Sequence, residues 1–232
     1  MQSKFHALNF RQNRTKWFAL AMGVAFLLSS AMPVLASGLT YNFQTINNPN
    51  DLTFNQLLGI NSSGTIAGYF GNGMTAATPN KGYTVASPYT SFTDENFPGS
   101  TQTQVTGINT MGNTSGFFVT SATTTINGNT VNVNSGFLDT GGVFTAVADP
   151  ASQFNQLLGL NDSGEAAGFY MDPATGNNVP FTYKGGAFTL LTSQFGTNSL
   201  ATGVNNAGDV TGFNLTSGDA FLLAGSTLTT LM

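Results

Sequence analysis

One phrase of this chain is repeated almost unchanged a hundred residues later. FNQLLGINSSGTIAGYF, residues 54–70, returns as FNQLLGLNDSGEAAGFY, residues 154–170, and weaker copies occupy residues 104–118 and 200–214. Each copy has a first glycine and, nine residues later, a second. The first glycines, spaced by 48, 52 and 44 residues, are Gly59, Gly107, Gly159 and Gly203. This period, combined with short β-type runs, is typical of propeller blades or a related β-array.

The sequence of each repeat unit predicts four short strands. In the first unit, residues 56–61 and 65–70 flank Asn61-Ser62-Ser63-Gly64, a turn sequence, and residues 82–86 and 89–93 supply two further runs. No long amphipathic helix interrupts the pattern. We therefore predict an all-β, propeller-like array of four roughly four-stranded antiparallel blades, with units near residues 56–93, 104–147, 156–191 and 200–231. A further strand is expected over Leu39–Ile46, and how the array closes is left open.

The first 36 residues have the features of a secretory leader. Lys4, Arg11, Arg14 and Lys16 precede an uncharged apolar core of about a dozen residues, which is shorter than a membrane-spanning helix, and small residues follow at 34–36. We expect cleavage near Ser37 and a single repeat domain over residues 37–232. The mature chain is expected in the periplasm or the extracellular space, without membrane insertion.

The composition beyond the leader narrows the function. Residues 37–232 contain two lysines, ten acidic residues and no Arg, His, Trp or Cys, which gives a net charge of −8. Without a basic patch, nucleic acid is not an expected partner. Without His or Cys, the usual general base and thiol nucleophile are missing, so we predict no catalytic residues and no enzyme activity. We also predict no cofactor.

Two pairs of acidic residues are candidate sites. Asp94 and Glu95 are adjacent at a strand end, where alternation directs them to opposite faces, so solvated loop charges are favoured over a catalytic carboxylate pair. Asp162 and Glu165 lack the ligand spacing of a calcium loop, and other repeats lack carboxylates at these positions. We interpret them as turn decoration and predict no metal site.

The repeated GINxxGxxxG pattern resembles the HAF repeat of bacterial extracellular proteins, named after a His-Ala-Phe tripeptide that follows the second glycine. The corresponding tripeptides here, each with an aromatic third residue, begin at Lys81, Ser135, Val179 and Asp219. The histidine is absent from every copy. The resemblance covers nearly all of the mature chain and implies a secreted, β-propeller-like protein from a family without an established activity.

The connections between strands vary in length on one side of the predicted array. In an up-and-down blade, the links from strand two to three and from blade to blade emerge on the same face. The segment 120–134 is expected to form an auxiliary hairpin there, turning at Asn127-Gly128. Variable loops on one side of a repeat array often mark recognition. The candidate ligand-binding residues on or near this face are Asp51, Asp94, Glu95, Asn127, Asp149 and Asp172.

Three functions remain in order of preference. The first is a non-enzymatic exported module that binds an extracellular or cell-surface ligand such as a polysaccharide, because Asn, Thr, Ser and Gln suit neutral hydroxylated partners. The second is a structural or matrix scaffold, and the third is a carboxylate-dependent glycosidase. The sequence does not decide the oligomeric state.

Overall fold

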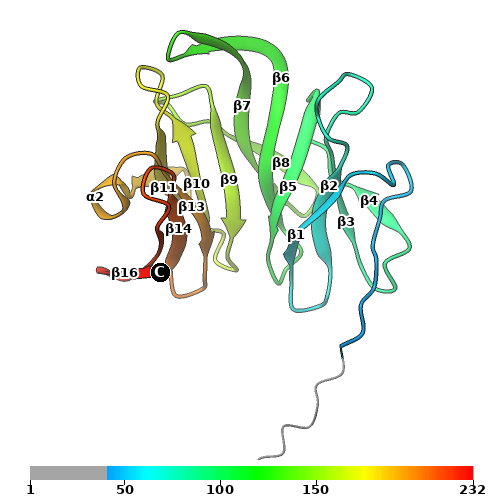
Figure 1. Cartoon of the computed structure of the whole chain (residues 1–232). Helices are drawn as coiled ribbons and strands as arrows, with labels where there is room; N and C mark the ends of the chain where they lie inside the picture. The colour runs from blue at the N-terminus through cyan, green and yellow to red at the C-terminus, as the bar shows by residue number, and fades with distance from the viewer. Residues whose placement is uncertain (1–40, 232) are drawn as a thin grey trace, which may run out of the picture. The chain divides into compact units, whose positions relative to one another are not determined.

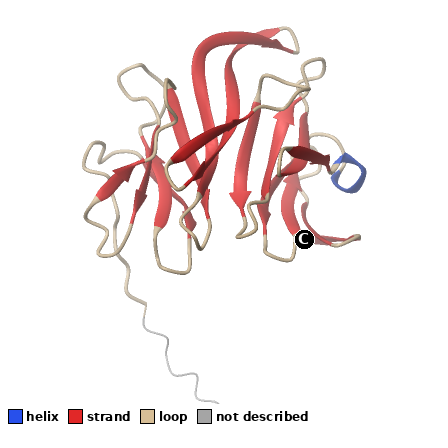
Figure 2. Ribbon diagram, turned by 180° about the vertical axis from the view of Figure 1, so that it is seen from behind, coloured by secondary structure: helices blue, strands red, loops and turns tan. Residues whose placement is uncertain are grey.

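The computed structural model describes residues 41–231, whose regular secondary structure is almost entirely strand (Figure 2). Sixteen strands are arranged in four antiparallel sheets, and each sheet consists of four strands consecutive in the chain. The all-β prediction is confirmed, as are the four-stranded units. The predicted leader over residues 1–36 lies outside the described residues. From Ile46 onward the chain forms one compact unit.

The strands of each sheet follow chain order (Figure 1). The first sheet contains β1 (Asn55–Ile60), β2 (Ile66–Phe70), β3 (Lys81–Val85) and β4 (Phe92–Asp94), and the second contains β5 (Gln102–Ile108), β6 (Thr114–Ile126), β7 (Asn129–Thr140) and β8 (Val143–Val147). The third contains β9 (Asn155–Leu160), β10 (Ala166–Met171), β11 (Asn178–Lys184) and β12 (Ala187–Leu190), and the fourth contains β13 (Ser199–Val204), β14 (Val210–Asn214), β15 (Ala220–Ala224) and β16 (Thr227–Leu231). A single turn of helix, α2 (Thr192–Phe195), precedes β13.

The strand predicted over Leu39–Ile46 is wrong for the part that the structure describes. Residues 41–46 form no strand. Each sheet already has four strands, and β16 occupies the edge of the fourth sheet beside β15. Ile46 instead packs against the core of the first sheet, which contains Ile66, Tyr83 and Val85.

The repeated turns form as the sequence predicts. In the first sheet, Asn61 Oδ1 accepts hydrogen bonds from the backbone N–H groups of Ser63 at 3.1 Å and Thr65 at 3.0 Å. Gly64 adopts φ +79°, a conformation that is unfavourable for residues with a side chain. An asparagine side chain that accepts from the backbone two residues on is a standard way to close a turn.

Apolar cores join consecutive sheets. Ala67 packs with Val105 and Phe137 between the first two sheets, Val147 with Leu157 and Phe181 between the second and third, and Ala167 with Ala201 and Phe221 between the third and fourth. Burying a valine or leucine fully is worth about 1.5–3 kcal/mol, so these cores are the main link between sheets. Within residues 41–231, no comparable packing joins β1 to β13 or β14.

A row of hydrogen bonds, which we call the asparagine ladder, connects the four turns. Nδ2 of Asn61 donates to the carbonyl of Asn109 at 3.1 Å, Asn109 donates to Asn161 at 3.3 Å, and Asn161 donates to Asn205 at 2.9 Å. Asn61, Asn109 and Asn161 therefore each close their own turn with Oδ1 and hold the next turn with Nδ2. The sequence indicates only the first of these roles.

The first glycines allow the inner strands to approach one another closely. A methyl group on Gly159 would lie 2.9 Å from Cα of Gly203 and 3.0 Å from the carbonyl oxygen of Thr202, and one on Gly107 would lie 3.1 Å from the backbone nitrogen of Leu160. The prediction that these glycines mark close backbone approach is confirmed for Gly59, Gly107 and Gly159, whereas Gly203 has only a side-chain hydroxyl of its own sheet nearby. Glycine is needed at those three positions because the backbone of the neighbouring sheet leaves no room for a side chain.

The expected auxiliary hairpin at residues 120–134 is wrong in one respect. Its Asn127-Gly128 turn forms, with φ of 47° and 76°, but its strands are extensions of β6 and β7, interrupted by an irregular register between Val119 and Thr123. Ile126, close to the turn, is buried. The segment is therefore a continuation of the second sheet, because the pairing of β6 with β7 resumes beyond the irregularity.

Candidate functional site

The connections of variable length gather at one end of the sheets, which we call the loop face. It includes the β2–β3 loop (residues 71–80), the β6–β7 turn (127–128) and the β10–β11 loop (172–177), all at the top of Figure 1. The four short turns of the asparagine ladder lie at the opposite end. This separation of long and short connections is the one that the sequence predicts.

Two hollows flank the β2–β3 loop. The first, which we call the Asp51 hollow, has a volume of about 290 Å³, and its lining includes Asp51, Thr53, Thr78, Pro79 and Lys81. The second, the Met74 hollow, has a volume of about 450 Å³, and its lining includes Met74, Thr75, Pro79, Thr101 and Gln102. Pro79 contributes to both, so one loop forms the wall between them.

The β2–β3 loop is held in place by hydrogen bonds to its surroundings. Within the loop, Gly73 N–H donates to the carbonyl of Thr78 at 2.8 Å, and Thr78 Oγ1 donates to Asn72 Oδ1 at 2.7 Å. Asn80, which is buried, accepts from Gln104 Nε2 of the second sheet at 2.8 Å. Both hollows are therefore bordered by fixed backbone, which lowers the entropic cost of binding.

Asp51 shapes the first hollow. Its Oδ1 accepts from Thr53 Oγ1 at 2.6 Å and from the backbone N–H groups of Thr53 at 2.8 Å and Phe54 at 3.1 Å. These bonds, with the Thr53 hydroxyl first, hold the pKa of Asp51 below its usual value. Asp51 is thus an ionised, oriented acceptor.

Asn127 and Asp172 belong to neighbouring loops. The backbone N–H of Asn127 donates to the carbonyl of Pro173 at 2.8 Å, so the β6–β7 turn rests on the β10–β11 loop. Asp172 Oδ1 accepts from the backbone N–H of Thr175 at 2.8 Å and from its hydroxyl at 2.9 Å. These bonds, the backbone one first, lower the pKa of Asp172. Asn127 is exposed at the tip of its turn.

Asp149 is buried and has a structural role. Its Oδ1 accepts from the backbone N–H of Ala151 at 2.8 Å, as Asn48 accepts from Asn50 at 3.0 Å before β1. Burial raises the pKa of Asp149. Burial and then the charges of Asp149 and Asp172 raise the pKa of Tyr170. Asp149 supports the loop face from below its surface.

Asp94 and Glu95 are divided, as strand alternation predicts. Asp94 is exposed, whereas Glu95 is buried between the first two sheets. Glu95 Oε1 accepts from Thr114 Oγ1 at 2.7 Å, and Asp139 of β7 is its acidic neighbour. Burial first, and then Asp139, raises the pKa of Glu95 to about 7. The interpretation of Glu95 as a solvated loop charge is wrong, because its side chain points into the sheet interface.

Asp162 also does more than decorate its turn. Its Oδ1 accepts from the backbone N–H of Thr110 at 2.8 Å, and its own N–H donates to Asn206 Oδ1 at 2.8 Å. It thereby joins the turns of the second, third and fourth sheets. Glu165 instead faces Lys184, with 3.8 Å between Oε2 and Nζ. The contacts of Asp162 with other turns could not be predicted from the sequence, because those turns are 44 to 52 residues away.

The six residues predicted from the sequence do not converge on one site. Asp51 lines a hollow, Asn127 and Asp172 meet in adjoining loops, Asp94 is exposed at the end of β4, and Glu95 and Asp149 are buried. Met74, Thr78, Lys81 and Gln102 line the hollows but are not among the residues predicted from the sequence. The length of the 71–80 connection was the available signal, although length does not identify which side chains face outward.

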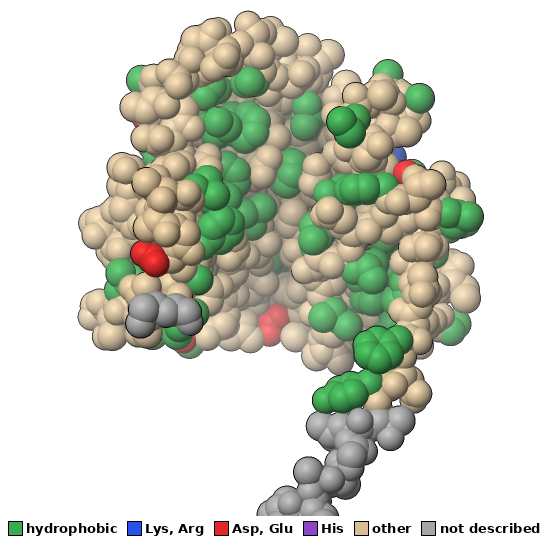
Figure 3. Space-filling model, viewed as in Figure 1, with side chains coloured by type: hydrophobic (Ala, Val, Ile, Leu, Met, Phe, Trp, Pro, Cys, Tyr) green, Lys and Arg blue, Asp and Glu red, His purple; other side chains and the backbone are tan. Residues whose placement is uncertain are grey.

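Charge is sparse on the surface around the sheets. Figure 3 shows few Asp, Glu, Lys or Arg side chains on the face in view, with apolar side chains among the backbone and the other side chains. Among residues 41–231, no group of three or more His, Cys, Asp or Glu side chains is arranged to hold a metal ion. In the same range, none of the helices has the length and apolar character to cross a membrane.

No protein-family model matches the chain, and no curated protein matches it significantly. The resemblance to the HAF repeat therefore stays a prediction, and so do secretion and ligand binding.

Proposed function

We propose that this chain is an exported, non-enzymatic, propeller-like module of four blades that binds a neutral, hydroxyl-rich ligand of the cell surface or its surroundings, such as a polysaccharide. Its binding surface is the loop face. The observation that carries the proposal is the pair of hollows beside the β2–β3 loop, lined by hydroxyl, amide and apolar groups with one carboxylate and one ammonium.

The chemistry of the hollows suits a sugar. Hydroxyl groups of a saccharide donate to carboxylates and accept from ammonium groups, which Asp51 and Lys81 provide in one hollow. In the other, Met74 is largely exposed beside Thr101 and Gln102 and offers a flexible apolar surface to the ring carbons. A strongly anionic ligand is disfavoured, because Lys81 is the only basic residue in either lining.

The glycosidase alternative receives little support from the buried carboxylates. Glu95 and Asp139 lie between two sheets, and neither lines a hollow beside the β2–β3 loop. General acid catalysis needs a carboxyl group within hydrogen-bond reach of the substrate.

The test is binding to a panel of neutral polysaccharides, with two methionine variants. Met74→Asp places a charge in a hollow of the loop face, whereas Met111→Asp places one in an exposed turn at the opposite end. We expect the first to weaken retention at least about tenfold, the equivalent of about 1.4 kcal/mol, and the second to leave it unchanged. Equal effects would remove the loop face as the site. Flat responses to every polymer would refute the ligand class, and release of reducing ends would refute the absence of catalysis.

A further inference from the structure

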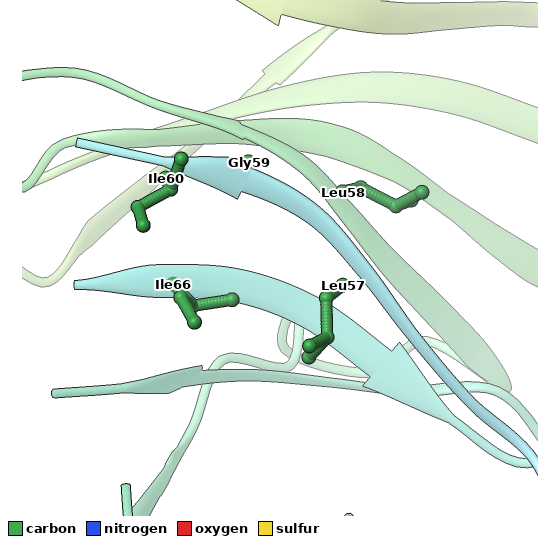
Figure 4. A pocket seen from close by; sticks show the side chains of 5 residues that line it. All are labelled: Leu57, Leu58, Gly59, Ile60 and Ile66. Carbon is green, nitrogen blue, oxygen red and sulfur yellow. The ribbon is translucent and has the colours of Figure 1, made fainter. Parts of the chain in front are cut away.

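The first sheet has an uncovered apolar side, which we call the leading face. Leu57 of β1 is 43% exposed, whereas the residues at its place in the next two repeats, Val105 and Leu157, are completely buried against the preceding sheet. Leu57, Leu58, Ile60 and Ile66 border a hollow of about 210 Å³ whose lining contains no polar side chain (Figure 4). The leading face is the surface on which a preceding sheet would pack.

The fourth sheet has the complementary uncovered side, the trailing face. Phe213 of β14 is 38% exposed, whereas its repeat equivalents Tyr69, Phe117 and Phe169 are 6–7% exposed against the following sheet. Thr211 is exposed too, at the place where Ala67, Ser115 and Ala167 are completely buried. The trailing face is the surface on which a following sheet would pack.

The asparagine ladder ends at these two faces. Asn205 Nδ2 has no following turn and donates to Asp209 Oδ2 of its own turn at 3.0 Å. The carbonyl of Asn61 accepts from Gly64 N–H, whereas the other three ladder carbonyls each accept a second bond from the preceding asparagine. Among the described residues, the ladder thus has an outgoing donor at one end and an acceptor with spare capacity at the other.

The close contacts of the first glycines with the following sheet also stop at the fourth sheet. A methyl group on Gly59, Gly107 or Gly159 would meet backbone of the following sheet within 3.2 Å. One on Gly203 would meet only the hydroxyl of Thr211 in its own sheet, at 2.9 Å. Because Gly203 has no side chain, a strand of another sheet could pack closely against it. Within residues 41–231, no following strand does so.

We propose that the trailing face of one copy of this chain docks on the leading face of a second copy, head to tail. The interface repeats the one found three times within the chain. β1 carries the sequence Asn-Gln-Leu-Leu-Gly, which is also the sequence of β9, and β9 already packs on the second sheet. In the new contact, Leu57 of one copy covers Phe213 and Thr211 of the other, and Asn205 donates to the carbonyl of Asn61.

A second copy fits better than a partner of different chemistry. The hollow of the leading face is lined only by apolar side chains and glycine. The trailing face supplies the exposed Phe213 ring, Gly203 and the amide of Asn205, whose second N–H group can donate beside its bond to Asp209. The two faces differ from each other, so the contact is heterologous and leaves one face of each kind free at the ends of any pair. Assembly is independent of the ligand of the loop face.

The experiment uses the full chain expressed with its own leader and purified in the form that the cell produces. Sedimentation velocity from about 1 to about 100 μM should show mass increasing with concentration, as association requires. Ile60→Lys disables the leading face and Phe213→Lys the trailing face, and Met111→Lys in an exposed turn is the control. Circular dichroism checks that each variant is folded.

The variants distinguish the arrangements. Head-to-tail docking predicts that each face variant is monomeric alone, that their equimolar mixture forms a dimer and nothing larger, and that Met111→Lys associates as the unaltered chain does. If one face variant still dimerises alone, the contact is face to face and the proposal is overturned. A chain that stays monomeric throughout the range also overturns it, and would mean that its own ends, or residues 1–40, cover these faces.

Discussion

Replacing Glu95 by glutamine should stabilise the protein at alkaline pH. Burial raises the pKa of this carboxyl from 4.5 to about 7, and the charge of Asp139 adds to the effect. A buried acid with a raised pKa holds its proton more tightly in the folded state. Below pH 4.5 both states are protonated and the group has no effect. Between pH 4.5 and about 7 the unfolded state ionises first, so stability falls as pH rises.

The size of the effect follows from the two pKa values. Each pH unit between them is worth about 1.4 kcal/mol, so the folded state loses about 3 kcal/mol through this group by pH 8. Glutamine cannot ionise, and its amide can donate to Oδ1 of Asp139, which is buried and has no hydrogen-bond partner. The variant should therefore match the parent near pH 4 and exceed it by up to about 3 kcal/mol at pH 8.

The assay is urea unfolding followed by circular dichroism at several pH values. The difference between the two curves isolates Glu95, because contributions from Asp51, Asp149, Asp162 and Asp172 are common to both proteins. Asp94→Asn, at the exposed neighbouring position, is the control and should shift the curve little. Parallel curves for Glu95→Gln and its parent would show that the carboxyl is ionised at no cost, and would refute the placement of its side chain between the sheets.

Three further predictions concern packing and export. Gly159→Ala should cost about 1–3 kcal/mol, because its methyl group meets backbone of the next sheet, whereas Gly203→Ala should cost under about 0.5 kcal/mol in the monomer, where only a rotatable hydroxyl is near. Equal losses in urea unfolding would contradict the inner-strand contacts. Ile126→Ala should cost about 2 kcal/mol, because Ile126 is buried at the tip of the second sheet, against under about 0.5 kcal/mol for exposed Thr125→Ala; a neutral Ile126→Ala would mean that the tip is a loosely attached loop. Mass spectrometry of the exported protein should find an N-terminus near Ser37, and an intact Met1 would refute the leader.

Local rules explain why the strands could be predicted. Asn at the start of each turn and Gly at its end act within five residues, and strand alternation acts within a few more. Residues such as Asn61 and Gly64 therefore indicate their hairpin without knowledge of the rest of the chain. The same locality accounts for the separation of Asp94 from Glu95, although only the structure places a neighbouring sheet over Glu95 and thereby raises its pKa.

Contacts between repeats could not be predicted from local rules. Nothing in Asn61 predicts that its amide donates to Asn109, and nothing in Asp162 predicts that it holds turns on either side, because these partners are 44 to 52 residues away. The Met74 hollow depends in the same way on Gln102 of the next sheet and on Thr101 just before it.

The sequence by itself determined four similar units of four strands, since turn chemistry and strand alternation are properties of short segments. Only the tertiary structure decided which copies are covered. Leu57 and Leu157 are the same residue in the same phrase, yet one is 43% exposed and the other completely buried. The physical reason is that burial depends on the neighbouring sheet: Leu157 has one before it, and within residues 41–231 Leu57 has none.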